Sequence, residues 1–284
     1  MRKKEMGGNM ESQAQSKNPV DVLTLVVISA SAYVLATALH ELAGHGLACL
    51  LVHGQVLELG AFYVNCGYNG LSDLAIRGVA FAGPLVSLLI GILAFILLPT
   101  VLAGHPQLKL FTWLLGTLGW MTFAGYLLFS GVSGLGDFGT SRDGLIYNAS
   151  PVWLWQILET VVGLAAYYGV VIFSGHRMDQ FIGGSGPDRV HRAQCISMLA
   201  YFSGVVVSLL ISLLNPVGIV IVLTSAAAAR LGGTSGLLWM MQLLNRKRED
   251  ATPPFQLRRS WPWIIAGLVA LAIYAGVFGP TLHP

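Results

Sequence analysis

The sequence predicts an all-α polytopic membrane protein with about six to seven transmembrane helices and a short membrane-associated β-hairpin after the first. Of its 284 residues, 55% are hydrophobic and only 10% are charged, against roughly 25% charged in soluble domains. Several uninterrupted apolar stretches reach the ~20 residues that cross a hydrocarbon core of about 30 Å. The segment after the first stretch is rich in aromatic and β-branched residues, which favour strands.

Seven apolar stretches are candidate helices, and the polar residues before them, 1–19, are expected to form a disordered tail. The stretches cover approximately residues 20–52, 78–103, 110–132, 152–174, 193–214, 217–244 and 261–279. The first is longer than one crossing requires, which implies tilt or a protruding end. Asn215-Pro216 is a turn signal between the fifth and sixth, and Gly232-Gly233 could break the sixth. We expect a single membrane domain.

The segment from Gln55 to Asp73 is too apolar for a solvent loop and too short in its apolar runs for a span. Gly67 and Asn69-Gly70 are its turn candidates, so we expect a β-hairpin. An extended polypeptide could add to the edge of such a hairpin by strand pairing.

The basic residues predict an integral, multi-pass protein whose N-terminus is cytoplasmic, because Lys and Arg accumulate in cytoplasmic loops. Only Arg77 and Arg142 then lie outside, with Arg230 inside a span. Thirteen lie on the cytoplasmic side: Arg2, Lys3, Lys4, Lys17, Lys109, Arg177, Arg189, Arg192, Arg246, Lys247, Arg248, Arg258 and Arg259. We expect a prokaryotic cell membrane as the location.

Neither a nucleic-acid partner nor a framework built on the cysteines is expected. The formal net charge is only +3 and no basic cluster is interleaved with aromatic residues, so nucleic acid is excluded as a partner. The three cysteines, Cys49, Cys66 and Cys195, are odd in number and show no CxxC spacing. They predict neither a disulfide framework nor a zinc ribbon.

Three ionisable residues, His40, Glu41 and His45, stand within six positions of the first apolar stretch. Such residues are costly in a membrane span and mark functional sites. Two imidazoles suit Zn²⁺, and an adjacent carboxylate can act as the base of a zinc peptidase. On a regular α-helix, positions i and i+5 lie about 140° apart, so we expect a π-bulge at Ala43-Gly44 to align the histidines. The alternative is a set of buried polar residues that bond between helices.

A catalytic zinc site needs a third protein ligand and an open position. Asp137, in a glycine-rich segment just past the third stretch, is the first candidate. Asp143 is the second, although it could equally be a turn residue or a helix N-cap. The motif, Asp137 and Gly83-Pro84 are all expected on one side of the membrane, because successive spans alternate in direction.

Other ionisable residues are expected to play ordinary roles. Glu159, inside the fourth stretch, is expected to be protonated or hydrogen-bonded, with Arg230 as a candidate partner. The remaining histidines lie at span ends or in loops and are expected to be surface or interfacial residues: His53, His105, His176, His191 and His283.

Residues Ala36 to Gly144 resemble the site-2 protease family of intramembrane zinc metalloproteases. The sequence LHELAGHG at 39–46 resembles the zinc helix of that family, and FAGPLVS at 81–87 resembles its Ala-Gly-Pro helix start, where Asn often stands at the position of Ser87. Gly136-Asp137-Phe138-Gly139 lies where its Leu-Asp-Gly ligand would fall. The histidine spacing here is one residue longer than in the family, whose zinc faces the cytosol.

The resemblance implies a zinc metalloprotease-like core in residues 20–151, with the hairpin at 55–73, followed by further transmembrane helices in 152–284. It implies an endopeptidase that cleaves a membrane protein substrate in or near the lipid bilayer, with His40, His45 and Asp137 as zinc ligands and Glu41 as the base. Two alternatives stay open. One is an inactive relative that binds transmembrane helices, and the other is a metal transporter.

Overall fold

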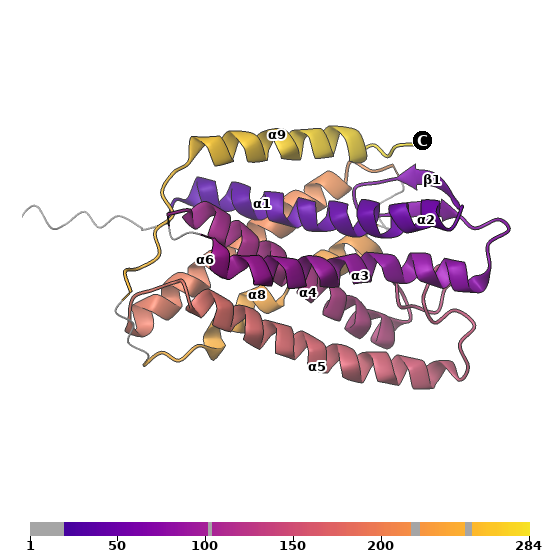
Figure 1. The fold of residues 1–284 in the computed structure, drawn as a ribbon, viewed down its shortest axis with the longest axis horizontal. Coiled ribbons are helices and arrows are strands. Elements are labelled where there is room, and N and C mark those ends of the chain that lie inside the picture. Colours follow the sequence, from indigo (N-terminus) through magenta and orange to yellow (C-terminus); the bar gives the residue numbers. More distant parts are fainter. Residues whose placement is uncertain (1–19, 102–103, 217–221, 248–251) are drawn as a thin grey trace, which may run out of the picture.

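The computed structural model describes residues 20–101, 104–216, 222–247 and 252–284 (Figure 1). The expected disordered tail, 1–19, lies outside these residues. Within them, six helices are long and apolar enough to cross a membrane, which confirms the predicted all-α polytopic fold. They span Val22–Leu51, Asp73–Thr100, Pro106–Ser133, Val152–Asp179, Gly186–Ser212 and Trp261–Phe278.

The first span changes its helical geometry partway along. It begins as α1 (Val22–Ala38), widens into the π-helix η1 (Leu39–Gly46) and ends as α2 (Leu47–Leu51). The other long helices are α3 (Asp73–Leu97) with the 3₁₀ turn η2 (Leu98–Thr100), α4 (Pro106–Ser133), α5 (Val152–Asp179), α6 (Gly186–Ser212) and α9 (Trp261–Phe278).

The expected helix over 217–244 is instead a series of short elements in the described part. These are the π-helix η3 (Val222–Gly232), α8 (Gly236–Trp239) and the 3₁₀ turn η4 (Met240–Leu243). The break follows Gly232-Gly233, where the sequence signalled one. Gly233 lies against Gly125 of α4, where an added Cβ on Gly125 would stand 3.1 Å from the Gly233 Cα. A Cβ on Gly233 would also stand 2.4 Å from the Ala229 carbonyl oxygen, so the break in this segment coincides with a position that has no room for a side chain.

The predicted hairpin forms from β1 (Gln55–Leu59) and β2 (Val64–Gly67), which pair antiparallel. Its turn is Gly60 to Tyr63, closed by a 2.9 Å bond from the Gly60 N–H to the Tyr63 carbonyl. Neither predicted candidate forms the hairpin turn. Gly67 ends β2, and Asn69-Gly70 forms a separate turn before α3, closed by a 3.2 Å bond from the Leu71 N–H to the Tyr68 carbonyl. Gly60 is required because a Cβ there would stand 2.5 Å from the Tyr63 ring.

Both ends of the hairpin are anchored to other parts of the chain. Cys49 of α2 forms a disulfide with Cys66 of β2, which corrects the expectation that no disulfide forms. The pairing was not evident from spacing because the fold, not the sequence, brings α2 beside β2. On the outer edge of β1, Leu59 and Leu282 exchange two backbone hydrogen bonds of 2.9 Å. The C-terminal segment thus covers that edge (Figure 1).

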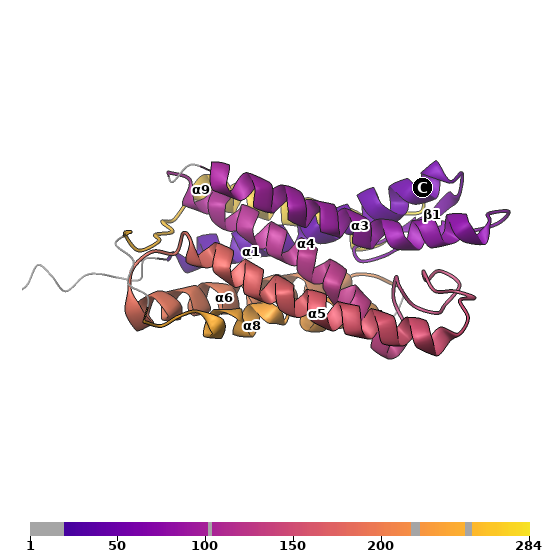
Figure 2. The same ribbon diagram turned by 60° about the horizontal axis from the view of Figure 1, so that its bottom comes forward.

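The helices pack around an apolar core that fills the end of the bundle opposite the hairpin. α4 lies between α3 and α5, and α1 packs on α6 and α9 (Figure 2). The fully buried Trp113 and Leu114 of α4 lie in this core with Leu25 and Ile28 of α1. Two ion pairs join helix ends there, Asp179 with Arg189 and Asp21 with Arg259.

The disulfide predicts an unequal reactivity of the three thiols. In protein denatured without reductant, a maleimide should add to Cys195 alone, because Cys195 is free and the other two cysteines are bonded to each other. After reduction three additions are expected, counted by mass spectrometry. A Cys195→Ser control should show no maleimide addition before reduction and two additions after it. Three additions before reduction would contradict the disulfide.

Candidate metal centre

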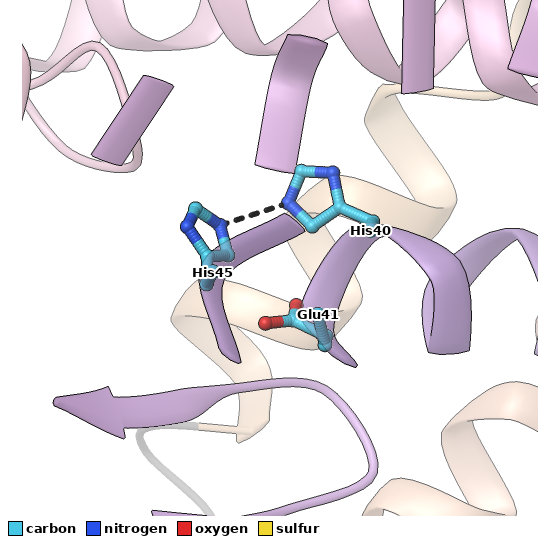
Figure 3. Close-up of side chains that lie close together, drawn as sticks. All are labelled: His40, Glu41 and His45. Atoms are coloured by element: carbon cyan, nitrogen blue, oxygen red, sulfur yellow. Dashed lines mark hydrogen bonds between the residues drawn. The ribbon is translucent and has the colours of Figure 1, made fainter. Parts of the chain in front are cut away.

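The π-helix η1 brings His40 and His45 onto one side of the first span. Their Nε2 atoms lie 3.2 Å apart, with Glu41 on the same turn (Figure 3). A regular α-helix would have pointed them about 140° apart, and the wider turn removes that difference. The predicted π-bulge is therefore confirmed.

Asp137 reaches the same point from the loop after α4. Its Oδ2 lies 3.1 Å from the His40 Nε2 and 3.5 Å from the His45 Nε2. Gly134 and Gly136, with φ of 73° and 83°, let the loop fold back at the end of α4. The Leu145 N–H also bonds the Asp137 carbonyl at 2.8 Å. The loop thus holds this carboxylate at the depth of the histidines, as the alternation of spans predicted.

The outer nitrogens of the two histidines are fixed by α3. His45 Nδ1 lies 2.8 Å from the Val79 carbonyl, which can only accept a hydrogen bond, so Nδ1 carries a proton and, in the neutral ring, Nε2 presents a lone pair. His40 Nδ1 lies 2.9 Å from the Ser87 hydroxyl. Partners of this kind orient metal-binding imidazoles in proteins.

The resulting arrangement directs hydrogen-bond acceptors at one another. With both histidines neutral, two nitrogen lone pairs and a carboxylate oxygen meet, and Asp137 Oδ2 is buried without a donor. Burial acts to raise the pKa of the Asp137 carboxyl, but the facing His45 and His40 lower it below its usual value. Three acceptors at this spacing require protons or a cation between them.

The spacing suits a zinc ion. Bonds of about 2.0–2.1 Å in tetrahedral geometry separate ligand atoms by about 3.3 Å, and the three distances here are 3.1, 3.2 and 3.5 Å. Two imidazoles and one carboxylate leave a fourth position open. The residues present therefore fit a catalytic type of zinc site.

Glu41 is placed beside this cluster. It is buried, and its carboxylate lies within 4.8 Å of the ligand nitrogens of both histidines. With His45, Asp137 and residues of β2 it lines a cavity of about 230 Å³. The cavity leaves space beside the cluster for water or a small chemical group.

Two tyrosines near the cluster were not singled out from the sequence. The Tyr126 ring stacks on His40 with centroids 5.3 Å apart. Burial, with the charges of Asp143 and Asp137, raises the pKa of Tyr68 to about 12, so its phenol stays a neutral donor at the cavity wall. One sequence signal could have identified Tyr126, because it is a polar aromatic residue inside an apolar span.

The remaining candidate residues lie apart from the three ligand atoms. Asp143 lines the cavity, but the described contacts of His40 and His45 involve Asp137 rather than Asp143. Glu159 lies in a different groove, and the structure describes no ion pair between it and Arg230. His191 contacts Cys195 at 3.6 Å on α6 and has no part in the cluster.

Glycines allow α3 to press against η1 at the cluster. A Cβ on Gly44 would stand 2.5 Å from the Gly83 Cα, and one on Gly83 would stand 2.3 Å from the His45 Nε2. The Ala-Gly-Pro segment of α3 therefore packs directly against the imidazoles of His40 and His45. The contact also places the Val79 carbonyl and the Ser87 hydroxyl within reach of the imidazoles.

No protein-family model, no curated protein and no solved structure matches this chain. The fold and the site define the class on their own. It is a multi-span membrane protein with a partly buried His-His-Asp cluster and an adjacent glutamate.

Replacing Gly83 tests the geometry of the cluster. In Gly83→Ala the new methyl group would collide with both ligand nitrogens, so zinc retained per purified chain should fall at least about tenfold. Gly78→Ala is the matched control, because a Cβ there meets nothing within 4 Å. Metal analysis of the two purified variants beside wild type gives the result. Equal zinc in all three would contradict a metal at this position.

Proposed function

We propose that this protein is an intramembrane zinc metalloprotease that hydrolyses a peptide bond of a membrane-spanning or membrane-associated protein. The observation that supports it most is the convergence of His40 Nε2, His45 Nε2 and Asp137 Oδ2 within 3.5 Å of one another. Glu41 stands beside them on the wall of an open cavity. The resemblance of residues 36–144 to the site-2 protease family agrees with this proposal.

The chain's own residues supply the groups that peptide hydrolysis needs. A zinc ion bound by His40, His45 and Asp137 would polarise the scissile carbonyl and acidify a water molecule. Glu41 accepts a proton from the attacking water and returns it to the leaving amine. Tyr68, as a neutral donor at the cavity wall, is placed to hydrogen-bond a substrate carbonyl.

A transmembrane substrate must be unwound before cleavage, because a helical amide has its carbonyl in an i to i+4 hydrogen bond. Val64, Asn65 and Cys66 of β2 line the cavity, while β1 and the C-terminal segment occupy the other side of the hairpin. The exposed edge for strand addition is thus that of β2, beside Glu41.

We further propose that the N-terminus is cytoplasmic and that the site opens to the opposite side of the membrane. The hairpin end carries only Arg77 and Arg142, whereas the described basic residues at the other end are Lys109, Arg177, Arg189, Arg192, Arg246, Lys247, Arg258 and Arg259. The Cys49–Cys66 disulfide at the hairpin end suits an oxidising compartment. A prokaryotic cell membrane stays a prediction.

Two other functions are consistent with the same residues. An inactive relative would retain the metal and bind transmembrane helices without cutting them. A transporter needs a polar path across the whole bundle, but the described residues between the site and its far end form an apolar core that includes Tyr33, Trp113 and Leu114. The core favours a site open to one side, as a protease requires.

Substitutions of Glu41 and His45 separate these functions. In proteoliposomes, Glu41→Gln should lower cleavage of a membrane-anchored model substrate at least about hundredfold, since the general base is lost, while zinc content stays at the wild-type level. His45→Ala should lose both zinc and cleavage. Unchanged cleavage by Glu41→Gln would rule out its role as base, and equal zinc in His45→Ala would remove the metal site. Zinc without cleavage in the wild type would favour the inactive relative.

The orientation has a separate test in intact cells. In a Cys195→Ser background, an impermeant maleimide should label Asn69→Cys, in the exposed turn after β2, and leave Lys247→Cys unlabelled. Permeabilisation should then expose Lys247→Cys. The reverse pattern would overturn the orientation and leave the metal centre unaffected.

A further inference from the structure

A second, apolar groove lies on the far side of the loop that carries Asp137. It has a volume of about 640 Å³ and runs between the outer halves of α3 and α5. Its lining is apolar apart from Arg77 and Glu159, and the Arg77 Nη2 already donates to the Tyr147 carbonyl. The apolar side chains that line it include Phe81, Phe138, Ile146, Leu158 and Val162.

Glu159 is the side chain of this groove for which the structure describes no hydrogen bond or ion pair. Arg77 also has an unpaired Nε, but its Nη2 is bonded to the Tyr147 carbonyl. Its side chain is 93% buried (7% exposed), and its Oε2 has no hydrogen-bond partner among the described residues. Buried polar groups in proteins are nearly always paired, and an ionisable residue in a membrane span marks a functional site by default. A ligand that enters the groove with a hydrogen-bond donor would satisfy the unpaired Glu159 oxygen.

The depth of Glu159 restricts what that ligand can be. It lies seven residues past Val152, where α5 begins, which is about 10 Å along the helix axis at 1.5 Å per residue. α5 has 28 residues and is about 42 Å long, so when it is centred on a hydrocarbon core of about 30 Å, Glu159 lies just inside the edge of that core. The hydrogen-bond donors of lipid headgroups lie outside the core. A transmembrane helix with a Ser, Thr, Asn or Gln side chain presents a donor there.

The loop that separates the groove from the metal cluster serves both sides. Asp137, Ser141 and Asp143 face the cavity of the cluster, whereas Phe138, Leu145 and Ile146 face the groove. Phe138 packs edge-on against Phe81 of α3, with ring centroids 6.1 Å apart. A helix in the groove thus lies one loop away from Asp137 and ends on the same side of the membrane.

We propose that this groove binds a transmembrane helix of the substrate, with a polar side chain of that helix hydrogen-bonded to Glu159. The inference rests on the proposed protease, since it takes the bound helix to be the substrate. Glu159 then selects helices with a donor at its depth, and the segment that follows the helix is delivered toward β2 and Glu41.

Photo-crosslinking tests the groove without any cleavage. The full chain carrying Glu41→Gln receives a benzophenone amino acid at Leu158, which lines the groove, or at Ile157, which is exposed on α5 and outside the lining. The probes are two single-span Leu/Ala peptides in proteoliposomes. They are identical except that one has Asn at the depth of Glu159 and the other has Leu.

The Leu158 position should crosslink the Asn peptide at least about threefold more than the Leu peptide, and Ile157 should show no preference. Glu159→Leu should abolish the preference, and Glu159→Gln, which keeps a hydrogen-bonding group, should retain it. Crosslinks to lipid alone, or equal yields for both peptides, would overturn the proposal that the groove binds a transmembrane helix. The same helix preference, together with a wild-type chain that cleaves no membrane-anchored substrate, would instead overturn the protease and leave helix binding in the groove intact.

Discussion

Three hydrogen-bond acceptors directed at one point inside an apolar bundle are the constraint on which the rest of this structure depends. The His40 and His45 nitrogens and the Asp137 oxygen lie too close together for a water molecule to separate them, so a cation or protons must lie between them. Bringing them together requires the π-turn of η1, the Gly44–Gly83 contact and the folded loop after α4. The π-turn departs from regular α-helix geometry, and the close packing of α3 on η1 at Gly44 and Gly83 holds it in place.

The hairpin shows how the open side of the site is organised. One strand is tied to α2 by a disulfide and the other is paired with the C-terminal segment, so the hairpin is anchored at both ends. What remains accessible is the β2 edge and the cavity behind it. A polypeptide that bound here by strand addition would therefore pair with β2.

Much of this arrangement can be predicted from the sequence, because bilayer thickness and helix geometry are simple constraints. The number of spans, the hairpin and the π-turn follow from apolar length, strand propensity and the five-residue separation of His40 and His45. Contacts that depend on three-dimensional packing do not follow. Cys49 and Cys66 are separated by 17 positions, the stacking of Tyr126 on His40 joins two spans, and the broken segment after Val222 depends on the approach of Gly233 to Gly125.

The pairing of Leu282 with Leu59 has a consequence for biosynthesis. During translation the hairpin leaves the ribosome more than 200 residues before its edge partner does, and α9 must insert before that partner can reach it. Until then the outer edge of β1 is unpaired, and the hairpin is held by the Cys49–Cys66 disulfide and by apolar contacts with α2 and α3. The outer edge of β1 is therefore completed only after α9 has been synthesised, although the hairpin itself is made much earlier.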